Sequence, residues 1–294
     1  MFYRRKIVLA LIELLGGEVE KLRLQKLLFL YSQKKPQAEY DFVPYKYGCY
    51  SYSLKADVTT LVKKGFLAET ENKYDKIDSS NYLQKLKPED AKYIRQVVCD
   101  YGQMSSNALI KHTYLNFPFY AIHSTIAKDV LSGKLYERVE KAMPDCEVIT
   151  LFTIGYEGIS LEKYLKKLIE NNIGLLVDVR KNALSMKFGF SKTLLKRYCN
   201  SLNIEYVHIP EVGINSDKRQ QLETQADYDQ LFADYRKTTL CETSKYQQEI
   251  LGLLLRHKRI ALTCFEAEPC QCHRSHLAQG IANTPDFKYL IKHL

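Results

Sequence analysis

Carboxylate, imidazole and guanidinium side chains follow runs of apolar residues at four points in the second half of the chain. Asp178 and Glu266 form a pair of the kind that hydrolyses a bond, one acid activating water and the other protonating the leaving group. His273 can act as acid or base near neutral pH. We predict that these three side chains are catalytic. The predicted substrate-binding residues around them are Gly155, Tyr156, Arg180, His208, Glu211, Cys264, Phe265, Cys272, Arg274 and Ser275.

The residues CHRSHLA begin a predicted helix whose first N–H groups and dipole favour a bound anion. Arg274 adds a guanidinium that can hold phosphate or carboxylate through two hydrogen bonds. An alternative with equal weight is that Arg274 pairs with Asp178 or Glu266 as a structural ion pair. The two acids then only orient Arg274 and Arg180.

The sulfur-rich stretch Cys264, Cys270, Cys272, His273 and His276 contains zinc ligands, but C-x5-C-x-C-H-x2-H lacks the usual paired spacing. We therefore predict no metal ligands and no cofactor, with Mg²⁺ and Zn²⁺ left as alternatives. Cys272 at a helix start is a second, minor candidate as a thiolate nucleophile. DVR after a strand and CHRS at a helix start are loosely similar to rhodaneses, but the glycine-rich anion loop is missing.

Four apolar segments alternate with helical patterns from residue 149 to 294: VITLFTIG, GLLVDVR, IEYVHIP and RIALTCFE. This alternation predicts a Rossmann-like α/β domain with a mainly parallel sheet covered on both faces. The carboxyl ends of parallel strands meet at one edge, where ligands bind. We therefore expect the polar residues above to form a single site.

The first half favours helices, with a third one around Tyr52–Lys63 followed by two short strands in FLAETENKYDKID. Leu83–Leu86 is a candidate to close that sheet. Three helices and a hairpin predict a winged-helix domain over residues 1–126, with a linker helix over 127–148. Such a domain can place its third helix in a DNA major groove, and the predicted DNA-binding residues are Tyr52, Lys55, Lys63, Lys64 and Lys73. The alternative is that these lysines are a solvated face.

Composition sets broad limits on the 294-residue chain. Its 46% hydrophobic residues suffice for ordinary globular cores, and no apolar run is long enough to span a membrane. Eight scattered cysteines favour reduced thiols and hence the cytoplasm. A formal net charge of +9 permits contact with nucleic-acid phosphates. A homo-oligomer is compatible with all of this.

Two family resemblances add to this interpretation. RLQKLLFLYSQ, FVPYKYGCYSYSLKADVTTLVKKGFL and TYLNFPFYAIHS, within residues 1–125, resemble winged-helix domains related to YwgA-type proteins. That resemblance implies a context of bacterial antiviral defence or mobile elements. TIGYEGISLEKYLKKL, LLVDVR, IEYVHIPEVG and CFEAEPCQCHRSHLA, within residues 150–285, resemble the family called domain of unknown function 488. Tyr156 stands where that family often has histidine, and Cys270 looks like an addition.

Together these features predict a hydrolase that acts on nucleic acid, with DNA as its partner. The favoured reaction is cleavage of the N-glycosidic bond of a modified or damaged base, as in a DNA glycosylase, with Tyr156 or Phe265 stacking on a flipped base. A metal-dependent nuclease with Mg²⁺ on Asp178 and Glu266 is one alternative. A regulator without enzymatic activity, which binds DNA and senses a nucleotide or another anion, is the other.

Overall fold

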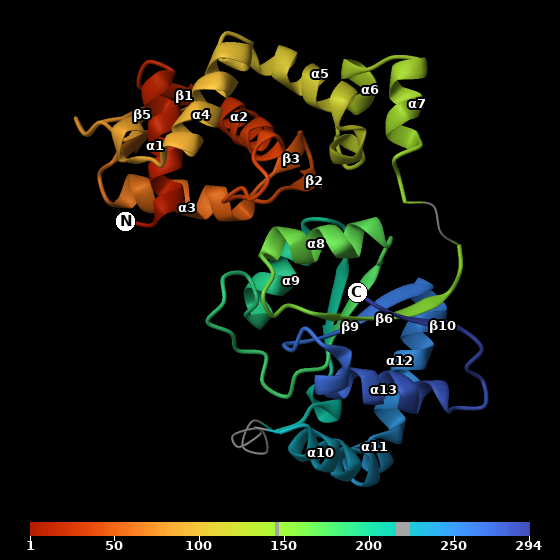
Figure 1. Cartoon of the computed structure of the whole chain (residues 1–294). Helices are drawn as coiled ribbons and strands as arrows, with labels where there is room; N and C mark the ends of the chain where they lie inside the picture. The colour runs from red at the N-terminus through yellow and green to blue at the C-terminus, as the bar shows by residue number, and fades with distance from the viewer. Residues whose placement is uncertain (145–146, 216–223) are drawn as a thin grey trace. The chain divides into compact units, whose positions relative to one another are not determined.

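The computed structural model describes residues 1–144, 147–215 and 224–294, and the chain divides into two compact units, Met1–Met143 and Pro144–Leu294 (Figure 1). The segment predicted as one linker helix, 127–148, instead contains two short helices, α6 (Ala127–Val130) and α7 (Lys134–Glu140). Both belong to the first unit, where Leu131 and Val139 are buried in a small apolar cluster. Residues 145 and 146 of that segment lie outside the described residues.

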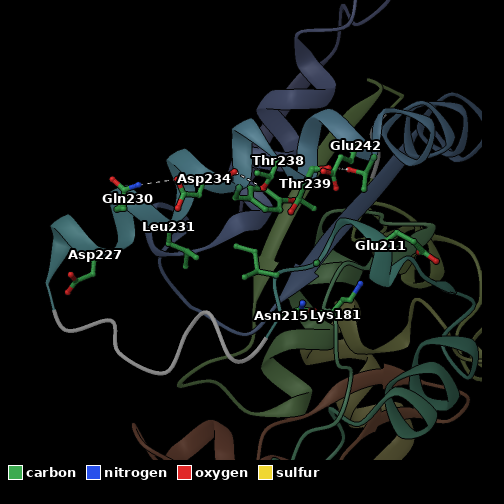
Figure 2. A pocket seen from close by; sticks show the side chains of 14 residues that line it. Lys181, Glu211, Asn215, Asp227, Gln230, Leu231, Asp234, Thr238, Thr239 and Glu242 are labelled. Atoms are coloured by element: carbon green, nitrogen blue, oxygen red, sulfur yellow. Dashed lines mark hydrogen bonds between the residues drawn. The ribbon is translucent and has the colours of Figure 1, made fainter.

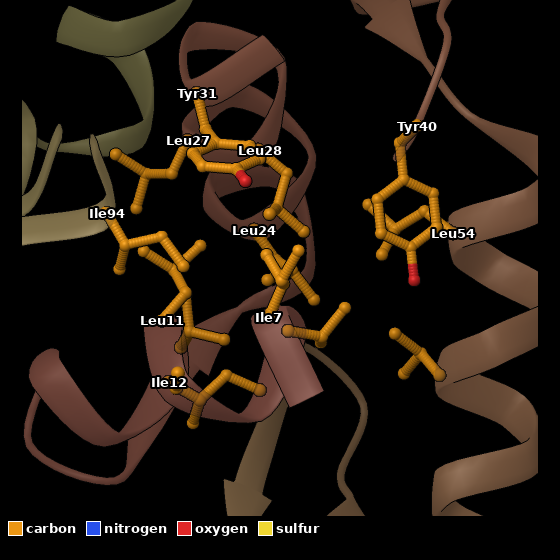
Figure 3. Close-up of a cluster of buried hydrophobic side chains, with 14 of the residues drawn as sticks. Ile7, Leu11, Ile12, Leu24, Leu27, Leu28, Tyr31, Tyr40, Leu54 and Ile94 are labelled. Atoms are coloured by element: carbon orange, nitrogen blue, oxygen red, sulfur yellow. The ribbon is translucent and has the colours of Figure 1, made fainter. Parts of the chain in front are cut away.

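The first unit is built from helices around a continuous apolar core (Figure 3). Helices α1 and α2 bury almost uninterrupted apolar stretches, and α3 and α4 each add one apolar face, because buried residues recur three or four apart along them. Other short elements complete the unit. The helices are α1 (Tyr3–Leu14), α2 (Lys21–Lys34), α3 (Tyr52–Lys63), α4 (Pro88–Tyr101), α5 (Ser106–Asn116), and the 3-10 turns η1 (Leu83–Lys85) and η2 (Pro118–Ala121).

Helix α3 has the predicted bounds, Tyr52–Lys63, and its first residues explain why it begins there. The Ser51 side chain accepts a hydrogen bond from the backbone N–H of Leu54, which caps the helix. The tight turn before it depends on Gly48, which has a φ of +90°. A Cβ there would lie 2.6 Å from the Tyr114 ring, and buried Lys26 donates to the Tyr47 carbonyl of the same turn.

Two small antiparallel sheets accompany these helices: β2 (Val43–Tyr45) pairs with β3 (Gly48–Tyr50), and a three-stranded sheet has the order β1-β5-β4. Its strands are β1 (Glu18–Glu20), β4 (Leu67–Glu69) and β5 (Lys73–Lys76). The expected β4–β5 hairpin is present, but the expectation for Leu83–Leu86 is wrong, because Leu83–Lys85 form η1. The third strand is β1, between the first two helices. The order of helices and strands in this unit is compatible with a winged helix, and the winged-helix assignment stays a prediction.

The second unit is a mixed α/β fold around a five-stranded, fully parallel sheet of order β10-β6-β9-β7-β8. The predicted α/β class with a parallel sheet is confirmed. The predicted strands correspond to β6 (Thr150–Gly155), β7 (Leu175–Asp178), β8 (Glu205–His208) and β9 (Arg259–Cys264), whereas the edge strand β10 (Leu290–His293) was not predicted. The helices are α8 (Leu161–Glu170), α9 (Lys192–Asn200), α10 (Gln225–Lys237), α11 (Thr239–Glu242), α12 (Ser244–His257), α13 (His273–Ala282), and the 3-10 turns η3 (Pro210–Val212) and η5 (Pro269–Gln271).

The two faces of the central strand β9 serve different layers (Figure 1). Leu262 packs in a buried cluster with residues of α12 and α13. Thr263, the next residue, accepts a hydrogen bond at 2.7 Å from Tyr164 of α8. Because successive strand residues face opposite sides, Cys264 belongs to the α13 side. In the part of the chain that the structure describes, no helix is both long and apolar enough to cross a membrane.

The buried carboxylate of Asp90 gives a test of the first unit. Asp90 accepts hydrogen bonds from Tyr3 (2.6 Å) and Tyr31 (3.2 Å) and pairs with Lys35 at 2.5 Å. Burial acts to raise its pKa, but the hydrogen bonds from Lys35 and Tyr3 outweigh it, so the pKa is lowered. A carboxyl with a lowered pKa stabilises the fold above its unfolded value and loses that contribution as the pH falls through the folded pKa.

We predict that Asp90→Asn lowers the free energy of unfolding by about 2 kcal/mol at pH 7, since a buried hydrogen-bonded charge is lost. The difference from the wild type should shrink as the pH falls from about 4, the ordinary pKa of an unfolded aspartate, through the lower pKa of Asp90 in the folded chain. Urea unfolding followed by far-ultraviolet circular dichroism measures it. Glu89→Gln, at an exposed acid in the same helix turn, is the control. Equal effects of both substitutions would contradict the role of the network.

Candidate functional site

The ends of β6, β7 and β9 meet the start of α13 around a cavity of about 290 Å³, which we call the strand-end cavity. The prediction that polar strand ends converge is therefore met for three of the four strands. Five of the predicted site residues line it: Tyr156, Arg180, Cys264, Phe265 and His273. The prediction missed Lys181, Asn182, Leu184, Ser185 and Ile214, of which the first four lie within five residues after Arg180 in the sequence.

Arg180 is held in place by Asp178, which is completely buried. The Arg180 Nε donates to Asp178 Oδ1 at 2.8 Å and Nη2 donates to Oδ2 at 2.5 Å, which is the two-pronged geometry of a strong pair. Tyr206 also donates to Asp178 at 2.6 Å. Hydrogen bonding and charge from Asp178 outweigh burial and raise the pKa of Arg180. The geometry thus gives Asp178 the task of orienting Arg180 instead of activating water.

Asp178 and Glu266 do not form the expected acid pair, because their side chains lie on opposite sides of the sheet. Val177 and Val179 pack in the cluster with α12 and α13, so Asp178 faces the opposite, α8 side. Glu266 is half-buried, and its Oε2 accepts a hydrogen bond at 3.2 Å from the Cys264 thiol, which lies on the α13 side. Of the two acids, Glu266 is the one placed near the strand-end cavity.

The loop after β9 is fixed by close backbone contacts. A Cβ on Gly155 would lie 1.8 Å from the Glu266 carbonyl oxygen, so only glycine fits there. Arg274 is fully buried and donates to the carbonyls of Glu266 (2.5 Å) and Ala267 (2.8 Å). Arg274 therefore braces this loop from inside and pairs with neither predicted acid. It does not offer an exposed site for an anion.

Three potential metal ligands, Cys264, Cys272 and His273, converge at the wall of the strand-end cavity, which Cys264 and His273 line. All three are buried, and their ligand atoms lie within 4.8 Å of one another. Cys270 is exposed, and His276 contacts Arg236 at 3.1 Å, so neither belongs to this group. Burial raises the pKa of the Cys272 thiol, the opposite of what a nucleophilic thiolate needs, so this geometry does not favour rhodanese-like chemistry.

The two predicted stacking aromatics have different surroundings. Tyr156 is buried and stacks on Phe190 with ring centroids 4.3 Å apart, and its hydroxyl accepts a hydrogen bond from Arg180 at 2.8 Å. Phe265 is 43% exposed and contacts the Tyr156 ring edge-on. Tyr156 is thus a wall of the cavity, and Phe265 is the aromatic face that a ligand can reach.

The remaining predicted residues lie around the cavity without lining it. His208 Nε2 donates to the backbone carbonyl of Arg180 at 2.9 Å, and Ser275 donates to the Pro269 carbonyl at 2.5 Å. Both side chains support loops. Glu211 lines a second cavity of about 590 Å³, formed with α10 and α11 (Figure 2).

Among the described residues that line this second cavity, four are acidic, Glu211, Asp227, Asp234 and Glu242, and one, Lys181, is a cation. Gln230 donates to Asp234 at 3.0 Å along its wall. A cluster of negative charge repels a phosphate group. Of the described residues that line the strand-end cavity, Arg180 and Lys181 are cationic and none is acidic.

Comparison with known protein families gives a match within the second unit. Residues 160–281 match the model of a family described as domain of unknown function DUF488. The matched region runs from the start of α8 to the end of α13 and lies within residues 150–285, where the resemblance was noted. A search of curated proteins found no match for the chain.

The predicted DNA-binding residues of the first unit differ in exposure. Tyr52 is buried against Tyr45 and Tyr50, so it is part of the fold. Lys55 pairs with Glu69 at 3.2 Å, and Lys73 pairs with Glu18 at 3.0 Å. Lys63 and Lys64, at the end of α3, are exposed, and their side chains make no ion pair or hydrogen bond with any described residue. Of the five, these two are the best placed to contact a phosphate.

We predict that Asp178→Asn lowers the free energy of unfolding by about 3–5 kcal/mol, because Arg180 is left buried without its counter-charge. Glu268→Gln, at an exposed acid of the same unit, should change it by less than about 0.5 kcal/mol. Urea unfolding of the whole chain measures both. A stable Asp178→Asn protein would show that the pair does not organise the unit.

Proposed function

We propose that the second unit is a hydrolase that cleaves the N-glycosidic bond of a base flipped out of DNA. The observation that carries the proposal is the make-up of the strand-end cavity. It has an exposed aromatic face at Phe265 and an exposed cation at Lys181. The half-buried carboxylate of Glu266 does not line the cavity but lies 3.2 Å from the thiol of Cys264, which does. Flipped bases are held by stacking and by hydrogen bonds to their edges.

The proposed reaction uses one carboxylate instead of two. Glu266 accepts a proton from a water molecule while the water oxygen forms a bond to the sugar carbon. The bond from that carbon to the base nitrogen breaks. The proton is then returned to the departing base, so the products are a free base and an abasic sugar. Lys181 and Asn182, both exposed on the rim, can donate hydrogen bonds to the base as negative charge develops on it.

The loop after β7 supports the flipping step. Leu184 lines the cavity and is 77% exposed, and Met186 two residues later is fully exposed. Apolar side chains of this kind enter the base stack in proteins that distort DNA. We propose that they fill the gap left by the flipped base.

The magnesium nuclease has less support, because Asp178 is occupied by Arg180 and Tyr206 on the other side of the sheet. The DNA-binding regulator stays an alternative that the following experiment separates from the enzyme.

We expect the purified protein to produce strand breaks in base-modified DNA only after treatment with alkali, which reveals abasic sites. Glu266→Gln should slow this by about 100-fold or more, the usual contribution of an acid or base. Glu268→Gln should leave the rate unchanged. Phe265→Ala should chiefly raise KM, because it removes a stacking contact. Direct breaks without alkali would indicate phosphodiester cleavage, and DNA binding without any product would indicate a regulator.

For the first unit, we propose that Lys63 and Lys64 contact DNA phosphates. The double variant Lys63→Gln/Lys64→Gln should weaken binding uniformly across sequences and lower the salt slope of log K by about 1.8, roughly 0.9 for each contact. Lys92→Gln, at an exposed lysine of α4, is the matched control. Fluorescence anisotropy at several salt concentrations measures the effect. An unchanged slope would mean that these lysines are only a solvated face.

A further inference from the structure

We propose that Cys264, Cys272 and His273 bind one zinc ion through the two Sγ atoms and the imidazole Nδ1. The three ligands come from two elements that meet at the cavity. Cys264 ends β9, Cys272 is the N-cap of α13, and His273 is the first residue of that helix. Zinc sites that hold three protein ligands of this kind are well known.

The distances fit a zinc ion. Cys264 Sγ lies 3.6 Å and Cys272 Sγ 3.9 Å from His273 Nδ1. Zinc bonds of about 2.3 Å to sulfur and 2.05 Å to nitrogen, at tetrahedral angles, separate those atoms by about 3.6 Å. The side chains are therefore close to the spacing that zinc requires, with all three at most 2% exposed. A small adjustment of Cys272 completes the geometry.

The imidazole of His273 is oriented with Nδ1 toward the two thiols. His273 Nε2 lies 3.0 Å from the backbone carbonyl oxygen of Val179. A carbonyl only accepts hydrogen bonds, so Nε2 carries the proton and Nδ1 directs its lone pair toward the two thiols. A histidine that binds metal through one nitrogen commonly donates the other N–H to such an acceptor.

The charges nearby suit a site with thiolates. Arg274 follows His273, is fully buried and bonds two carbonyls, and no described acidic residue forms a salt bridge with it. A buried guanidinium without a carboxylate is costly unless another negative group lies close by. Two zinc-bound thiolates would supply negative charge beside it.

Three protein ligands leave the fourth tetrahedral position for water, as in catalytic zinc sites. Both Cys264 and His273 line the strand-end cavity, and Glu266 Oε2 lies 3.2 Å from Cys264 Sγ. Zinc lowers the pKa of a bound water, and a neighbouring carboxylate can take its proton. That catalytic consequence rests on the proposed function, whereas the binding of zinc does not.

The test is the metal content of the full-length chain after zinc is added and excess ion is removed. We expect about one zinc per chain by plasma mass spectrometry, and Cys264→Ser or His273→Gln should weaken binding by at least about tenfold. Cys270→Ser, at the exposed neighbouring cysteine, should bind zinc like the wild type. Circular dichroism checks that each variant is folded.

A measurement on the wild-type chain covers the case in which a variant does not fold. Cobalt exchanged for zinc should give the strong visible bands of a tetrahedral site and a sulfur-to-metal charge-transfer band. A chain that binds no zinc, a Cys264→Ser variant that binds as well as Cys270→Ser, or a Cys264–Cys272 disulfide in freshly purified protein would each overturn the proposal. Zinc binding without base release would contradict only the proposed function, and base release by zinc-free protein would contradict the zinc-bound water.

Discussion

The ion pair between Asp178 and Arg180 organises the rim on which the rest of the proposed site depends. Arg180 makes hydrogen bonds to Asp178 at the end of β7, to the Tyr156 hydroxyl just after β6 and to the Phe190 carbonyl, so one planar group ties three segments together. Both charges are buried, and such a pair must be well satisfied because the loss of either partner is costly. With Arg180 fixed, the neighbouring Lys181 and Asn182 project at the cavity rim.

Because side chains alternate along each strand, the two faces of the sheet carry different groups. Asp178 faces α8, where it holds the arginine, and Cys264 faces α13, where the sulfur and imidazole groups gather. One face thus supplies rigidity, and we propose that the other supplies the reactive groups. Gly155 at the end of β6 allows the loop after β9 to pack closely against it, since any side chain there would collide with the Glu266 backbone.

Much of this arrangement could be predicted from the sequence because hydrophobic periodicity is a local property. The strands β6 to β9, helix α3 with its Ser51 cap, and the convergence of strand ends follow from such patterns. The edge strand β10 was missed because the pattern in its four residues is too short, with mainly exposed side chains. The partner of Asp178 could not be chosen either, since both Arg180 and Arg274 were available in the sequence. The choice between the two arginines depends on which side of the sheet each side chain faces, and the sequence does not give that.

The sulfur cluster illustrates the same limit. The spacing of Cys264, Cys270, Cys272, His273 and His276 argued against zinc, because a short motif was expected to supply paired ligands. In the structure the three residues that we propose as ligands come from a strand end and a helix start, and η5 between them leaves Cys270 exposed. Spacing along the chain is therefore a poor guide where the tertiary fold brings two elements together.

We propose that the strand-end cavity hydrolyses the bond between a base and its sugar. This activity is tested most directly by mass spectrometry of the small molecules released when the protein is incubated with base-modified DNA. We expect free base to accumulate with the wild-type chain and to be nearly absent with Glu266→Gln. Equal release by both proteins, or no free base from any modified DNA that the protein binds, would contradict it.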